Sequence, residues 1–169
     1  LDHPDTREAL EGLFGDRLNG GIIMHGGFFL GPEAFYQRLR ELDDDTRAAI
    51  NMTRVNIIND LYGGEDLRLL QRRDARFVNT AFTATLLGAA VSDQLEDGRV
   101  LSGVGGQYNF VSQAHELPGA RSILMTRAWR ERGGEAASNV LFSYAHNTIP
   151  RHLRDMVITE YGVADLRGK

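Results

Sequence analysis

Three glycines within four positions make up the stretch of this chain whose residue types could most directly do chemistry. These are Gly103, Gly105 and Gly106. The bend follows an apolar segment that ends at Leu101, and it precedes a helical pattern that begins near Phe110. Glycine permits positive φ and lets a ligand approach the backbone, so the NH groups of such a bend can bind an anion or a developing oxyanion. A tight strand-to-helix turn with no ligand explains the same residues equally well.

Several familiar catalytic motifs are missing from the sequence. The glycines do not follow G-x-G-x-x-G, and no acidic residue about 20 positions later suggests a ribose partner, so a dinucleotide site is poorly supported. Ser102 lacks the G-x-S-x-G setting of a serine hydrolase. The five histidines show no H-E-x-x-H motif and no paired ligand spacing, and there is no cysteine. We therefore predict no metal site.

Two groups of charged residues have roles that the sequence leaves open. Arg127, Arg130 and Arg132 flank a Gly-Gly loop. They form either a patch for a phosphorylated ligand or a solvated helix end. Glu160 follows an apolar segment, at the carboxyl end of a predicted strand, where α/β proteins often place ligand groups. It could equally cap or orient the neighbouring loop.

Composition sets the broad class. A chain of 169 residues, 42% hydrophobic and 25% charged, suits one globular domain with its own core. The net charge of −4 argues against a nucleic-acid partner. No apolar run approaches the roughly 20 residues of a membrane span, so no membrane partner is expected and a cytoplasmic location is the default. Both ends look cut, which suggests a piece of a longer polypeptide.

Helical and strand patterns alternate along the chain, and this alternation predicts an α/β layered domain. We expect a helical lead-in over residues 1–20 and the α/β domain over residues 21–169. Expected strands cover 22–24, 54–58, 77–81, 99–101, 121–126, 139–142 and 156–159. Expected helices cover 32–42, 46–52, 67–70 and 110–117.

Three stretches carry a resemblance to a known family. They are Gly-Phe-Phe-Leu-Gly at 27–31, followed by Phe35-Tyr36; the glycine stretch 102–110; and Val-Ile-Thr-Glu-Tyr-Gly-Val-Ala-Asp-Leu-Arg-Gly at 157–168. In this order, from about Gly21 to the end, they resemble the C-terminal domain of the acetyl-CoA hydrolase/transferase family. These are the class I CoA transferases, which include acetate and 4-hydroxybutyrate CoA-transferases.

The resemblance implies an open layered sheet with helices on both faces, paired with a similar N-terminal domain in the full-length protein. It implies a ping-pong reaction in which a glutamate attacks an acyl-CoA thioester. An acyl-glutamyl anhydride and then a glutamyl-CoA thioester form, and CoA passes to a small carboxylate or to water. Each step builds negative charge on a carbonyl oxygen. Coenzyme A is itself a substrate and no cofactor is expected; acetate metabolism is the implied setting, and a homo-oligomer is left open.

The resemblance also assigns roles to residues at matching positions. The oxyanion-stabilising main-chain amide falls on Gly105 or Gly106, and Asn59 matches a turn that borders the acyl pocket. The remaining candidates for contacts with CoA or the acyl group are Gly103, Gln107, Arg127 and Arg151.

The sequence departs from the family pattern at two points. Relatives commonly have Asp where this chain has Asn109, which alters how the helix after the loop is held. The family's glutamate lies in a Ser-Glu-Met-Phe-like segment that is not found here, so we expect the nucleophile upstream of Leu1 and the fragment alone to be inactive. Two alternatives stay open: a non-catalytic CoA-binding or interaction module, and an unrelated α/β phosphate-binding domain.

Overall fold

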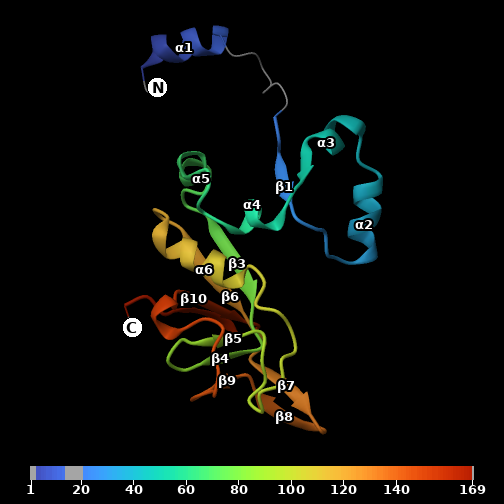
Figure 1. Ribbon diagram of the computed structural model, residues 1–169, viewed down its shortest axis with the longest axis vertical. Coiled ribbons are helices and arrows are strands. Elements are labelled where there is room, and N and C mark those ends of the chain that lie inside the picture. The colour runs from blue at the N-terminus through green and yellow to red at the C-terminus, as the bar shows by residue number, and fades with distance from the viewer. Residues whose placement is uncertain (1–2, 14–20, 169) are drawn as a thin grey trace. The chain divides into compact units, whose positions relative to one another are not determined.

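The computed structural model describes residues 3–13 and 21–168, and the chain divides into two compact units (Figure 1). The first unit runs to Ile58 and the second begins at Asn59. The domain boundary predicted between residues 20 and 21 falls at the edge of a stretch that is not described, and it stays a prediction. None of the helices in the described ranges is both long enough and apolar enough to cross a bilayer.

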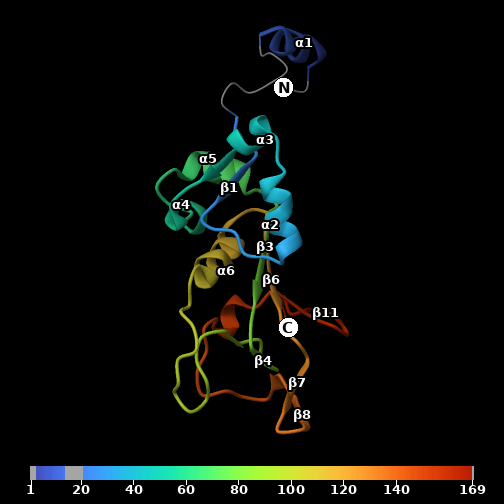
Figure 2. The same cartoon turned by 90° about the vertical axis from the view of Figure 1, so that its right-hand side faces the viewer.

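The second unit is built on a four-stranded sheet with the strand order β11-β10-β6-β3. Strands β3 (Arg76–Thr80), β6 (Arg121–Met125) and β10 (Met156–Thr159) run parallel, and β11 (Gly162–Asp165) is an antiparallel edge strand. Parallel neighbours need a crossover connection, and α6 (Gln107–Glu116) lies within the one between β3 and β6. It packs against both strands, as Figures 1 and 2 show.

The main core lies between α6 and one face of this sheet. In β6, Ser122 and Leu124 are buried and alternate with less buried neighbours, as expected for a strand that is covered more fully on one face. A second cluster of Leu61, Leu117 and Ala120 lies where α6 ends. Phe77 packs against this cluster, and its ring also stacks on Phe110 of α6, with the ring centroids 5.6 Å apart. The main cluster comprises Ala81, Ala90, Val111, Leu124 and Ile149.

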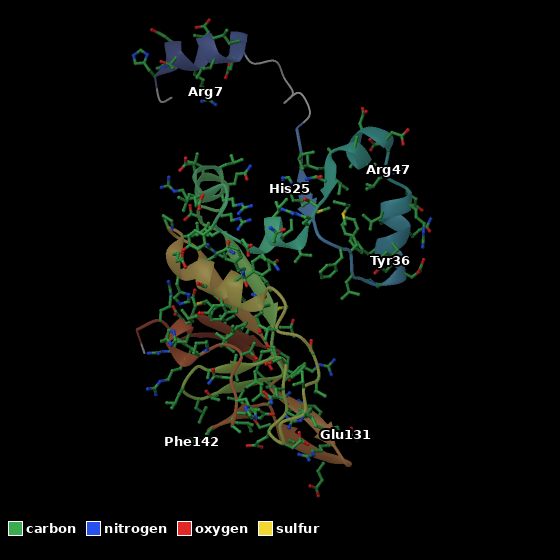
Figure 3. The ribbon with its side chains drawn as sticks, viewed as in Figure 1. Arg7, His25, Tyr36, Arg47, Glu131 and Phe142 are labelled. Atoms are coloured by element: carbon green, nitrogen blue, oxygen red, sulfur yellow. The ribbon has the colours of Figure 1, made fainter. Side chains whose placement is uncertain are left out.

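Smaller elements complete the second unit. Figure 3 labels the exposed Phe142, which follows β9, and Glu131 on the β7–β8 hairpin. The elements are β4 (Thr83–Thr85), β5 (Ala90–Val91) and β9 (Val140–Leu141) in a second sheet, the hairpin of β7 (Trp129–Arg132) and β8 (Glu135–Ser138), α5 (Glu65–Gln71), and the 3-10 helix η1 (Arg151–Leu153).

The first unit contains a parallel pair of short strands. In their register His25 faces Asn51, and Nδ1 of the histidine lies 3.0 Å from Nδ2 of the asparagine (Figure 3). None of the described residues in this unit is fully buried. Its elements are α1 (Pro4–Leu13), β1 (Met24–Gly26), α2 (Glu33–Arg40), α3 (Asp44–Ala48), β2 (Ile50–Met52) and α4 (Val55–Asn59), which leads into the second unit.

The α/β class is confirmed, and the predicted strands at 77–81, 121–126 and 156–159 correspond to β3, β6 and β10. The strand predicted at 54–58 is wrong: β2 has already taken the place beside β1, so the β-branched residues that follow form α4. The helix predicted at 46–52 ends at Ala48, because residues 50–52 form β2. Residues 99–101 form only an isolated bridge, Gln94 to Val100, because this segment closes a loop.

Replacing Ile149 by alanine tests the position of the core. Ile149 is fully buried in the main cluster, so we expect Ile149→Ala to lower the free energy of unfolding by about 2–5 kcal/mol. Leu86 is 64% exposed, and Leu86→Ala should stay within about 0.5 kcal/mol of the parent chain. Urea unfolding followed by circular dichroism measures both. Equal losses in the two variants would contradict this core.

Candidate functional site: the glycine loop and Asn59

The glycine loop (residues 102–106) lies at the carboxyl edge of the parallel sheet. It leads directly into α6, and Nε2 of Gln107, the first residue of that helix, donates a hydrogen bond of 3.0 Å to the carbonyl oxygen of Thr80. Thr80 is the last residue of β3. This bond fixes the N-terminus of α6 beside the end of a parallel strand, the position where open α/β sheets bind ligands.

The loop leaves its main-chain donors unused. At its base, the NH groups of Leu101 and Ser102 both donate to the carbonyl oxygen of Asp93, at 2.7 and 3.2 Å. Above that base, the NH groups of residues 103–106 donate to no acceptor in the part of the chain that the structure describes. Residues 103–105 are exposed, and Gly105 has a φ of +60°, a conformation that favours glycine. These NH groups are therefore available to an anionic ligand.

Asn59 packs directly against the last glycine of the loop. A Cβ added to Gly106 would lie 2.4 Å from Nδ2 and 2.7 Å from Oδ1 of Asn59, so only glycine fits without moving the asparagine. The side-chain amide of Asn59 forms no hydrogen bond with any other residue in the described ranges. A side-chain donor and the free main-chain donors thus lie together, and two residues named from the sequence meet in space.

A set of polar side chains fixes the turn that carries Asn59. Nε2 of Gln113 donates to the carbonyl oxygen of Asn59, and Oε1 of Gln113 accepts from Nη1 of Arg72 at 2.5 Å. The same Nη1 donates to the carbonyl oxygen of Asp60 at 2.9 Å, and Nδ2 of Asn109 donates to the Asp60 carboxylate at 2.9 Å. Partial burial lowers the pKa of the Arg72 guanidinium, but from so high a starting value that it stays charged.

A cavity of about 390 Å³ opens at the end of β3; it reaches Leu101, and none of residues 102–106 lines it. Its lining includes Thr80, the anchor of Gln107, and Leu101, which precedes the glycines. Arg127 and Arg130 also line it, whereas Arg132 does not. The cavity therefore combines an apolar wall with two of the three arginines that the sequence offered as an anion patch.

Glu160 supports this edge of the sheet. One of its carboxylate oxygens accepts a hydrogen bond of 2.8 Å from the NH group of Ala128, next to Arg127. The side chain therefore orients the segment after β6, one of the two roles that the sequence left open.

Gln107 and Arg151, two of the residues predicted to contact CoA or the acyl group, do not line the cavity at the end of β3. Gln107 is 7% exposed, and its Nε2 forms the hydrogen bond to Thr80 described above. Its Oε1 is buried and has no hydrogen-bond partner in the described chain. Arg151 begins η1 and lines another cavity, with Leu86, Leu87 and Arg154, that shares no residue with the lining of the cavity at the end of β3. Their contacts with CoA stay predictions.

Arg72 and Gln113 hold the turn that carries Asn59, and the sequence does not single them out. A glutamine within a helical pattern is usually predicted to be exposed to solvent, so the sequence gives little indication that Gln113 is buried. The position of Gln113 four residues after Asn109, and so on the same face of α6, was the only hint. In the described ranges no three His, Asp or Glu side chains gather as a metal site would require.

The sequence pattern of the acetyl-CoA hydrolase/transferase C-terminal domain matches residues 31–169. The chain belongs to this family. The predicted resemblance is thereby confirmed, and the match includes Asn59, the glycine loop and the whole four-stranded sheet.

Individual relatives agree with the family. A 4-hydroxybutyrate coenzyme A transferase of Clostridium kluyveri is 29% identical over 109 residues, which are 64% of this chain and 25% of the relative. A probable butyrate:acetyl-CoA coenzyme A-transferase of Syntrophomonas wolfei is 30% identical over 95 residues, 54% of this chain and 21% of the relative. The chain thus spans a quarter or less of the length of these curated relatives.

Solved structures show the same fold. RipA from Yersinia pestis superposes with a TM-score of 0.62 at 26% identity, covering 83% of this chain and 29% of that protein. A 4-hydroxybutyrate CoA-transferase from Porphyromonas gingivalis gives 0.53 at 25% identity, covering 77% of this chain and 28% of that protein. The fold prediction of a CoA-transferase C-terminal domain is confirmed.

Replacing Asn109 by aspartate tests the bond between α6 and Asp60. In Asn109→Asp two carboxylates face each other, so we expect the free energy of unfolding at pH 7 to fall by about 1–3 kcal/mol. Repulsion raises the pKa of one carboxyl in the folded variant above its unfolded value, so stability is lost as pH rises and recovers near pH 4. Urea unfolding of the chain at both pH values measures this.

The exchange of the two residues is the matched control. Asp60→Asn combined with Asn109→Asp reverses donor and acceptor and should restore most of the lost stability. An Asn109→Asp variant with equal losses at pH 4 and pH 7, or a double variant no more stable than it, would contradict the assigned contact.

Proposed function

We propose that this chain supplies the oxyanion-binding half of an enzyme that transfers CoA from an acyl-CoA thioester to a carboxylate or to water. The supporting observation is the group of unengaged NH donors at 103–106 beside the free amide of Asn59. The nucleophilic glutamate would lie outside this chain, on the N-terminal part of the full-length protein. No cofactor is proposed, because coenzyme A is itself a substrate.

The proposed chemistry needs donors of this kind. When a carboxylate attacks a thioester, the carbonyl oxygen becomes an oxyanion, and breakdown of that intermediate expels the CoA thiolate. Fixed donors aimed at this oxygen stabilise the transition state without reorganising. Gly105 and Gly106 are the proposed main-chain donors, and Asn59 is a side-chain donor next to them. Gly103 would let the thioester approach the backbone closely.

The cavity at the end of β3 suggests where the rest of the substrate lies. Arg127 and Arg130 would attract the phosphate groups of CoA or the acceptor carboxylate, and the apolar wall with Leu95 and Leu101 would contact an aliphatic portion. Arg151 would act only if CoA extends to its separate cavity.

Replacing Gly106 by valine in the full-length protein tests this proposal. The new side chain would displace Asn59 and disturb the loop, so we expect kcat for CoA transfer or thioester hydrolysis to fall by about 100- to 1,000-fold. Steady-state turnover of short acyl-CoA substrates measures the effect, and circular dichroism confirms that the fold persists. Turnover within severalfold of the parent would refute the role of this glycine.

Gly12→Val is the matched control, because a Cβ at Gly12 meets nothing within 4 Å. It should leave turnover unchanged. A parent protein that binds CoA but turns over no short acyl-CoA, with or without added acetate or butyrate, would support a non-catalytic CoA-binding module instead.

A further inference from the structure

Gln113 lies on the buried face of α6, one turn beyond Asn109, and is 3% exposed. A primary amide in such a place is costly unless both its ends are hydrogen bonded. Both are: Nε2 donates to the carbonyl oxygen of Asn59, and Oε1 accepts from Arg72 at 2.5 Å. Only this orientation of the amide satisfies both partners, because a carbonyl oxygen must receive a donor and a guanidinium must meet an acceptor. The side chain is therefore locked.

Gln113 bonds to the main-chain carbonyl of Asn59 and not to its side chain. The Asn59 side chain forms no hydrogen bond of its own within the described residues, so its position against Gly106 depends on where the main chain is held. Arg72 holds the next peptide by donating to the carbonyl oxygen of Asp60. Two consecutive carbonyl groups of the turn are thus fixed by one pair of side chains.

We propose that Gln113 and Arg72 are positioning residues for the oxyanion site. They would hold the Asn59 amide at the distance from the loop that the developing oxyanion requires. This proposal rests on the proposed function. Neither residue lines the cavity that contains Arg127 and Arg130, and their bonds go to the turn that carries Asn59, so we expect their effect on turnover to pass through Asn59. Loss of alignment at the reacting centre can cost about 100-fold in rate, even from a group that touches no substrate.

Gln113→Glu in the full-length protein is the sharpest test. The carboxylate still accepts from Arg72, but the donor to Asn59 is replaced by an oxygen that repels the carbonyl. We expect kcat to fall by about 10- to 100-fold, with KM within about threefold of the parent. Gln37→Glu, an exposed glutamine on α2 whose Nε2 donates to a single acceptor, is the matched control and should change neither.

Combination with Asn59→Ala separates positioning from a general loss of structure. If Gln113 acts through Asn59, then Gln113→Glu lowers kcat by less than about threefold once Asn59 is already alanine. An equal loss of kcat in both backgrounds would overturn the proposal, and so would an unchanged kcat in the single variant.

Hydrogen exchange tests the positioning without relying on activity. Peptides covering residues 55–64 of the full-length protein should exchange faster in Gln113→Glu than in the parent or in Gln37→Glu. Unchanged exchange would overturn the positioning role, whatever the activity. If exchange rises while Asn59→Ala and Gly106→Val keep full turnover, the positioning of the turn holds and the proposed oxyanion role of the loop fails.

Discussion

The contact between Asn59 and Gly106 is the constraint on which the candidate site depends. It leaves no room for a Cβ at Gly106, and it places a side-chain amide beside main-chain NH groups that have no acceptor in the described chain. Donors that are left without partners are unfavourable for folding alone, and they are useful only if a ligand completes them. The loop tolerates this because residues 103–105 are exposed, so water can solvate the donors until a ligand displaces it.

Buried and half-buried polar side chains hold the turn that carries Asn59, although the face of α6 around them is largely apolar. Gln113 is as buried as Leu117, which caps the end of α6, yet its side chain forms hydrogen bonds with Asn59 and Arg72. An apolar residue at position 113 would add more hydrophobic stabilisation but could not form a hydrogen bond with the Asn59 carbonyl. The arrangement exchanges stability for a defined position of one turn, which is the usual balance at a functional site.

The sequence predicts the elements that carry strong periodicity and misses those decided by tertiary pairing. The helix after the glycine loop and strands β3, β6 and β10 follow from local pattern, because each is apolar on at least one face and bounded by turn residues. Val55 to Ile58 read as a strand by propensity, yet form a helix because the strand position beside β1 is already taken. The loop glycines and Asn59 could be named in advance, whereas Gln113 and Arg72 could not. A buried amide and an exposed one look alike in sequence, and only the packing of α6 shows which acceptors it meets.

The chemical character of the loop's surroundings argues for a divided site. The groups that the structure places at the loop are amides and main-chain NH groups, which stabilise charge but do not attack a thioester. Ser102, the one side-chain hydroxyl within the loop, donates to the carbonyl oxygen of Gly103 and not to a carboxylate or a histidine. A site of this kind can lower a barrier only for a nucleophile delivered from elsewhere. The two curated relatives are about four or more times longer than the part matched here, and the proposed function assigns that delivery to polypeptide outside this chain. Under the proposed function the fixed position of Asn59 matters, because donors on one part of the protein can serve a nucleophile on another only if their own geometry does not shift.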